Sequence, residues 1–173
     1  MIDPGSVNFT LTATTSAAKP AGTYLNPESH VRHALDFAAR YGFHPAFAIY
    51  EPGFTRGGAA LARAASVKTP IYRFMRSEQF ALGFPPKPYA PAAHLALLEE
   101  EAGPAPWMIA GLGRRYPPPD RRGGHVRVGL EDARLGTTIG NLALVEEAVR
   151  IVRDHGAEPA TAAERRQALL EAS

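Results

Sequence analysis

The stretch Pro45-Ala46-Phe47-Ala48-Ile49-Tyr50 is a short apolar run that ends at the turn residues Glu51-Pro52-Gly53. A short run that is almost continuously apolar is typical of a strand covered on both faces, which is the usual state of strands in a parallel sheet. The stretch therefore predicts an α/β fold, in which helices cover the sheet.

The sequence on either side alternates between further apolar runs and longer segments with helical periodicity. A first helix is expected after Asn26, the expected N-cap, and Pro27, and it should end near Gly42. The other expected elements are strands over 79–84, 107–110 and 125–128, part of a strand within 7–13, and helices over 56–66 (capped by Thr55), 90–102, 141–155 and 162–171 (capped by Thr161).

This order of elements gives about four βα units with parallel strands. A complete (β/α)8 barrel, or TIM barrel, needs roughly 200–250 residues. The chain has 173 residues, which is enough for about half of such a barrel. We therefore expect residues 1–173 to form a single partial TIM-barrel domain.

The composition excludes several classes of protein. The absence of cysteine excludes disulfide scaffolds, thiolate zinc sites and a cysteine nucleophile, and it makes a cytoplasmic location the expectation. The net charge of +2 gives no indication of nucleic-acid binding. No apolar run approaches the ~18 residues of a membrane span, and no signal-peptide pattern is present, so no membrane partner is expected.

Residues 123–132 (GGHVRVGLED) carry the most informative pattern of charges. With the two-residue period of a strand, Arg127 and Glu131 share one face and the apolar residues share the other. Buried charges are tolerated where they pair or bind a ligand. In an extended strand Arg127 and Glu131 would lie ~13 Å apart, so they converge only if the chain curls after Gly129. A structural ion pair and a solvated loop remain alternatives to a functional site.

The segment HVRVGLED at 125–132 resembles the signature of the β-keto acid cleavage enzymes, which include the 3-keto-5-aminohexanoate cleavage enzyme. Several motifs in register make the resemblance specific, and it covers nearly the whole chain. The other matching motifs, in the family's order, are Gly5-Ser6-Val7-Asn8-Phe9, Tyr50-Glu51-x-Gly53, Phe80-x-Leu82-Gly83, Trp107-x-x-Ala110-Gly111-x-Gly113-Arg114, Asn141-x-x-Leu144-Val145 and Ala160-Thr161.

The resemblance implies the C-terminal half of a zinc-dependent (β/α)8 barrel, in which this chain supplies strands five to eight and the N-terminal portion is absent. It also implies two small-molecule partners, a β-keto acid and acetyl-CoA, which give acetoacetate and a new acyl-CoA. Arg127 would match the family's catalytic arginine, Asp132 the aspartate that works with it, and Glu131 a zinc ligand. Zinc and a guanidinium both stabilise the negative charge of an enolate or a tetrahedral oxyanion.

The chain departs from the family pattern at positions that matter for metal binding. The family's other two zinc ligands come from a His-x-His pair, and none of the six histidines here forms one. Ala46 and Ala48 stand where the family has glutamates, and Ala133 replaces the Asn that usually follows Glu-Asp. We therefore expect weak zinc binding if any, because one carboxylate cannot hold the ion.

Two further motifs have an open interpretation. Gly111-Leu112-Gly113 with Arg114 could cradle a phosphate of CoA, since barrels often bind phosphate after strands seven and eight; a plain turn is the alternative. Tyr50 and Glu51, at a strand end, fit either a wall of the substrate site or a turn.

Three functions stay open at this point. The chain is an enzyme of the cleavage family, a catalytically inactive half barrel, or a small module that binds an acyl or phosphate ligand. Half of a parallel barrel exposes unpaired strand edges and an apolar inner face, which favour association. We therefore expect a homo-oligomer.

Overall fold

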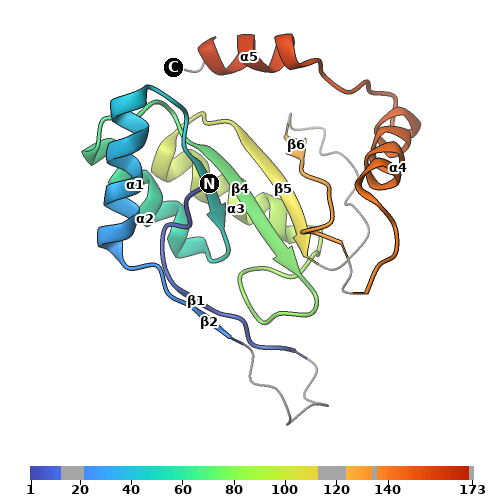
Figure 1. Ribbon diagram of the computed structural model, residues 1–173, viewed down its shortest axis with the longest axis horizontal. Coiled ribbons are helices and arrows are strands. Elements are labelled where there is room, and N and C mark those ends of the chain that lie inside the picture. The colour runs from blue at the N-terminus through green and yellow to red at the C-terminus, as the bar shows by residue number, and fades with distance from the viewer. Residues whose placement is uncertain (13–21, 113–123, 134–135, 172–173) are drawn as a thin grey trace.

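The computed structural model describes residues 1–12, 22–112, 124–133 and 136–171, which form an α/β fold (Figure 1). The short strands β1 and β2 pair in antiparallel fashion, and the other four strands form a separate sheet. The elements in chain order are β1 (Val7–Asn8), β2 (Thr23–Tyr24), α1 (Glu28–Tyr41), β3 (Ala46–Ile49), α2 (Pro52–Ala64), β4 (Ile71–Ser77), α3 (Tyr89–Ala102), β5 (Trp107–Leu112), β6 (His125–Val126), α4 (Asn141–Asp154) and α5 (Ala162–Glu171).

The strands β3, β4, β5 and β6 are parallel neighbours in chain order, which is how strands follow one another in the wall of a (β/α)8 barrel. The N-terminal residues add a parallel bridge along the edge of β3 that does not pair with β4. The N–H of Ile2 donates to the carbonyl of Ala46 at 2.8 Å, and the N–H of Ala48 donates to the carbonyl of Ile2 at 3.0 Å. The described residues form no closed barrel. The four parallel strands in chain order, with their helices, confirm the predicted α/β half barrel.

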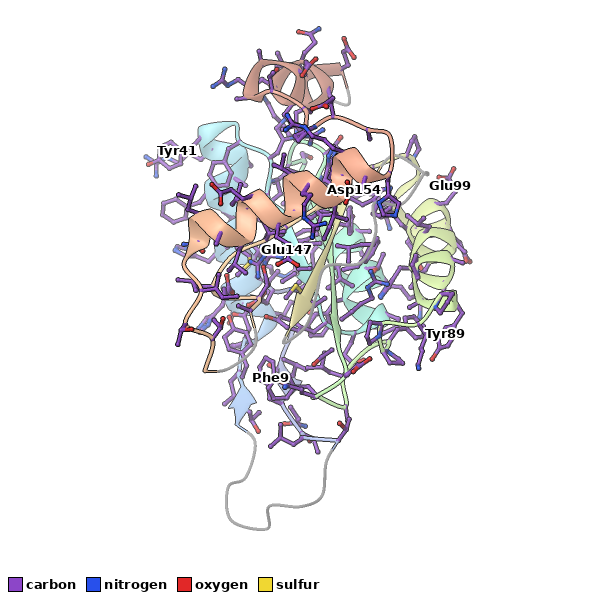
Figure 2. All side chains as sticks on the ribbon, turned by 90° about the vertical axis from the view of Figure 1, so that its right-hand side faces the viewer. Phe9, Tyr41, Tyr89, Glu99, Glu147 and Asp154 are labelled. Carbon is purple, nitrogen blue, oxygen red and sulfur yellow. The ribbon has the colours of Figure 1, made fainter. Side chains whose placement is uncertain are left out.

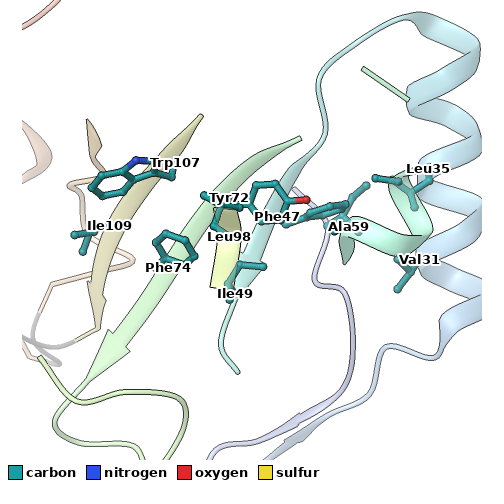
Figure 3. Packing of buried hydrophobic residues seen from close by; sticks show 12 residues of the cluster. Val31, Leu35, Phe47, Ile49, Ala59, Tyr72, Phe74, Leu98, Trp107 and Ile109 are labelled. Carbon is teal, nitrogen blue, oxygen red and sulfur yellow. The ribbon is translucent and has the colours of Figure 1, made fainter. Parts of the chain in front are cut away.

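The larger hydrophobic core lies between the sheet and the helices α1, α2 and α3 (Figure 3). Alternate strand residues point into it, and the rings of Phe47 and Tyr72 meet edge to face with centroids 5.5 Å apart. The residues of this cluster are Ile2, Val31, Leu35, Phe47, Ile49, Ala59, Ala62, Tyr72, Phe74, Leu98, Trp107 and Ile109.

The opposite, inner face of the sheet carries a smaller cluster. The ring of Phe9, next to β1, meets the ring of Tyr50 with centroids 5.5 Å apart and the ring of Phe80 at 5.3 Å. The hairpin of β1 and β2 and the connection after β4 therefore cover part of this face. The buried members of the cluster are Val7, Ala48, Tyr50, Met75, Leu82 and Ala110.

The strand expected over 79–84 is wrong. The strand is β4 at Ile71–Ser77, and residues 79–84 belong to the connection that follows it. Arg73 and Arg76 interrupt the apolar pattern of β4, which concealed the strand. Phe80 forms an isolated antiparallel bridge with Leu11, so the segment is locally extended and has the residues of a strand without belonging to the sheet.

Two expected helix caps are also wrong. The helix α1 begins after Pro27, while Asn26 donates its backbone N–H to Ser6 Oγ at 2.8 Å and its side-chain amide to the carbonyl of Asp3 at 2.5 Å. The helix α2 begins at Pro52, so Thr55 is buried inside the helix and does not cap it. Both helices start without a side-chain cap. Pro27 is the N-cap residue of α1, whereas Pro52 is the first residue of α2, where its backbone angle already suits a helix.

Two other helix ends agree with the prediction. Gly42 follows α1 in the left-handed conformation, with φ of 66°. Thr161 caps α5 in a reciprocal arrangement: the N–H of Glu164 donates to Thr161 Oγ1 at 3.2 Å, and the N–H of Thr161 donates to Glu164 Oε2 at 2.7 Å.

The helices α4 and α5 lie away from the sheet, with α4 beyond β6 (Figures 1 and 2). The helix predicted at 141–155 is present as α4. Because α4 lies away from the sheet, Leu144 is its single buried residue, and Leu142 is 73% exposed. Among the described residues, no helix is long and apolar enough to cross a membrane.

Candidate active site

Charged and polar side chains meet where the parallel strands end. Asp3 follows the bridge residue Ile2, Tyr50 follows β3, and Arg127 follows β6. The carboxyl ends of neighbouring parallel strands open at the same edge of a sheet, where barrel enzymes place their active sites. Asp3, Arg127 and Glu131 all act on the pKa of Tyr50, so these groups are within electrostatic reach of one another.

Arg127 makes the central contacts of this site. Its Nε donates to Asp132 Oδ2 at 2.8 Å and its Nη2 donates to Asp132 Oδ1, so the carboxylate is held in bidentate fashion. Its Nη1 donates to Glu131 Oε2 at 2.9 Å, which confirms that Arg127 and Glu131 converge. The side chain of Asp132 is 2% exposed and that of Glu131 is 63% exposed. The bidentate contact is the stronger and more rigid of the two.

A tight turn brings these three side chains together. The N–H of Asp132 donates to the carbonyl of Gly129 at 3.1 Å, so the chain curls at the predicted place. Asn141, the first residue of α4, accepts the N–H of Leu130 through its Oδ1 at 2.9 Å. A β-carbon placed at Gly129 would lie 3.4 Å from that same oxygen, which is an ordinary contact, but the backbone φ of +157° at this position favours glycine.

Burial and pairing act in opposite directions on this ion pair. Burial raises the pKa of Asp132, and the hydrogen bonds and charge of Arg127 offset part of the rise. Burial lowers the pKa of Arg127, but the Asp132 and Glu131 carboxylates outweigh burial and raise it. Arginine stays protonated in proteins, so Asp132 is the member of the pair that can exchange a proton.

Arg73, in the middle of β4, is a site residue that sequence reasoning missed. Its side chain is buried, and its Nε and Nη2 atoms have no hydrogen-bond partner among the described residues. Burial lowers the pKa of Arg73, and the charge of Arg127 lowers it further. A signal was available, because Arg73 alternates with the aromatic residues Tyr72 and Phe74 and so points to the opposite face of the sheet.

Asp3 is a second missed residue. Burial raises its pKa, while a hydrogen bond from Tyr24 and the charge of Arg73 lower it in part. Its Oδ1 is buried without a hydrogen-bond partner among the described residues. An aspartate before Pro4 has the pattern of a turn residue, so the sequence carried no distinct signal for this position.

The structure separates the two candidates at the end of β3. Tyr50 is buried on the inner face, and burial together with the charge of Asp3 raises its pKa. Glu51 accepts the backbone N–H of Gly83 at 3.1 Å and so ties the connection after β4 to the end of β3. Tyr50 therefore lies against the charged side chains, whereas Glu51 holds a loop.

A family match now adds to this geometry. The family model described as beta-keto acid cleavage enzyme (BKACE) matches residues 1–170, which includes the turn that carries Arg127 and Asp132. The chain belongs to the beta-keto acid cleavage enzyme family. Membership confirms the resemblance seen in the sequence motifs, and it agrees with a half-barrel arrangement of parallel strands.

The phosphate cradle expected in this beta-keto acid cleavage family member is placed only in part. Gly111 lies in β5, where it pairs with Arg76 of β4. Gly113 and Arg114 lie outside the described residues. The binding of a CoA phosphate by this motif therefore stays a prediction.

The described residues of this beta-keto acid cleavage family member do not fit a zinc site. A structural or catalytic Zn²⁺ takes at least three protein ligands. No group of three His, Cys, Asp or Glu side chains that could hold a metal occurs among residues 1–12, 22–112, 124–133 and 136–171. Glu131, the predicted ligand, is bound by Arg127, as is the neighbouring Asp132.

Proposed function

We propose that this chain converts a β-keto acid and acetyl-CoA into acetoacetate and a new acyl-CoA. The bond between C2 and C3 of the β-keto acid breaks, and its carboxymethyl fragment forms a bond to the acetyl carbonyl carbon. The CoA sulfur passes to the acyl group that is left. The exchange balances without an oxidant or a net change in protons, and family membership supports the substrate class.

The bidentate Arg127–Asp132 contact carries this proposal. Breaking a carbon–carbon bond next to a carbonyl develops negative charge on oxygen, which a preorganised cation stabilises. Arg127 supplies that cation at the carboxyl end of β6, and the buried Asp132 holds its guanidinium plane. Because burial raises the pKa of Asp132, its carboxyl is also suited to take up and return a proton.

The family resemblance implies zinc, but the proposed reaction includes no step that uses the ion. The described donor set does not fit the ion, because Glu131 and Asp132 both bind Arg127. Arg127 and Arg73 are the cations that the inner face offers to the substrate in its place.

The test is formation of acyl-CoA from a panel of β-keto acids with acetyl-CoA, followed by mass spectrometry of the CoA esters. We expect turnover by the chain and a loss of about 10²-fold or more for Arg127→Lys, because lysine cannot hold Asp132 and the substrate in one planar arrangement. Arg150→Lys is the matched control, since Arg150 is exposed on α4, far along the chain from the charged turn, and pairs with Asp154 at 3.2 Å.

Two results would overturn the proposal. Absence of every acyl-CoA product would favour the inactive half barrel, and undiminished turnover by Arg127→Lys would remove the role of the arginine. Circular dichroism of both variants establishes that a loss of activity does not come from a loss of fold.

A further inference from the structure

Arg73 carries a buried charge, and two of its guanidinium nitrogens make no hydrogen bond to a described residue. The side chain is 6% exposed, and neither Nε nor Nη2 has a hydrogen-bond partner among the described residues. Burying an unpaired guanidinium destabilises a fold, because the charge loses its hydration and gains nothing in return. A cation kept in such a place is a candidate for binding an anion that is absent from the free protein.

The strands on both sides of Arg73 provide no counter-charge. In the register of the sheet Arg73 pairs with Ala48 of β3 and with Met108 of β5. Neither of these side chains carries a charge that could pair with the guanidinium.

The acidic side chains near Arg73 either bind Arg127 or make no hydrogen bond to Nε or Nη2 of Arg73. Arg127 binds both Asp132 and Glu131. Asp3 acts on Arg73 through space, but burial raises the pKa of Asp3, and its Oδ1 makes no hydrogen bond to a described residue. Among the described residues, none of these carboxylates accepts a hydrogen bond from Nε or Nη2 of Arg73.

We propose that Arg73 binds a carboxylate of the β-keto acid, an inference that rests on the proposed function. The free atoms Nε and Nη2 form one edge of the guanidinium fork, and that edge matches the two oxygens of a carboxylate. Arg127 uses the same two atoms to hold Asp132, so the chain itself shows the contact that Arg73 lacks.

The carboxylate has two sources, which two probes distinguish. Acetoacetate carries only the carboxylate common to all β-keto acids, whereas 3-oxoadipate carries a second one at its far end. Isothermal titration calorimetry of the full chain with each probe measures binding without turnover. We expect Arg73→Met to weaken the binding of at least one probe tenfold or more, and Arg150→Met, on the exposed face of α4, to leave both unchanged.

Weakening of both probes assigns Arg73 to the common carboxylate, and weakening of 3-oxoadipate alone assigns it to the distal one; both results support the proposal. Undiminished binding by Arg73→Met, or no binding of either probe to the unmodified chain, would overturn it. Binding that depends on Arg73 without any acyl-CoA formation would instead count against the proposed reaction alone.

A stability measurement separates a binding role from a structural one. Without ligand, Arg73→Met should raise the melting temperature, because an apolar side chain beside Met75 and Met108 replaces an unpaired buried charge. Arg73→Lys keeps the charge and should recover part of the lost binding. A lower melting temperature for Arg73→Met with no recovery of binding by Arg73→Lys would show that Arg73 serves the fold.

Discussion

The buried imidazole of His94 should make the protein lose stability in acid. His94 lies in α3 with its side chain fully buried, stacked on Phe74 at a centroid distance of 4.4 Å and edge-on to Phe84 at 5.0 Å. Neither ring nitrogen has a hydrogen-bond partner among the described residues. Burial, and then the charge of Arg76, lower the pKa of His94 to about 4. The perturbation we choose is His94→Leu, which removes the titration and the two unsatisfied nitrogens.

The sign and the size follow from the shift. The unfolded chain binds a proton at its ordinary pKa of 6.5, while the folded chain resists it until about pH 4. Stability is therefore fully present above pH 6.5 and is lost as the pH falls toward 4. The shift of His94 corresponds to about 3 kcal/mol across that window. Removing His94 should flatten the profile by this amount.

The assay is urea unfolding at pH 7, 5.5 and 4, followed by circular dichroism. The quantity compared is the change in the free energy of unfolding between pH 7 and pH 4, so a uniform cost of a poor leucine fit cancels. His30→Gln, an exposed histidine on α1, is the control and should keep the wild-type profile. An equal loss of stability in His94→Leu and in the wild type would show that His94 does not cause the sensitivity to acid.

Two further results are expected. Gly83→Ala should destabilise the fold by about 2 kcal/mol or more in urea unfolding, because Gly83 has φ of +51° and a β-carbon there would lie 2.3 Å from the carbonyl oxygen of Tyr50. Gly53→Ala is the control and should not destabilise the fold, because no atom lies within 4 Å of its β-carbon position. Equal stability of the two variants would contradict this expectation. In sedimentation velocity at micromolar concentration the chain should self-associate, because the sheet is open in its described part and α4 exposes Leu142; a single monomer species would speak against this.

The sequence was most informative where one local pattern decides the structure. The apolar runs at β3 and β5 and the leucine-rich segment of α3, which stops at Gly103-Pro104, have no strong competitor, so their type and place agree with the structure. The sequence also defined the condition for Arg127 and Glu131 to meet, which is a curl after Gly129, and the structure meets that condition. The cap at Thr161 follows from its spacing to Glu164.

The misses come from tertiary contacts that override local patterns. The strand β4 carries two arginines, and only its place between β3 and β5 makes a strand of it. Asn26 has a good capping side chain, but its side-chain amide donates to the carbonyl of Asp3, and its backbone N–H donates to Ser6. Both partners come from a segment distant in the sequence. The grouping of Asp3, Arg73 and Tyr50 depends on which strands are neighbours, which no local window of sequence contains.

Asn141 links α4 to the turn after β6. Its backbone begins α4, and its side chain accepts the N–H of Leu130 in the turn that sets Arg127 against Asp132. The position of the first turn of α4 is therefore coupled to the turn that orients the Arg127 guanidinium through the amide side chain of Asn141. The hydrogen bond between Leu130 and Asn141 thus couples the position of α4 to the geometry of the charged site. Position 141 can keep this hydrogen bond only with a short side chain that carries an oxygen acceptor.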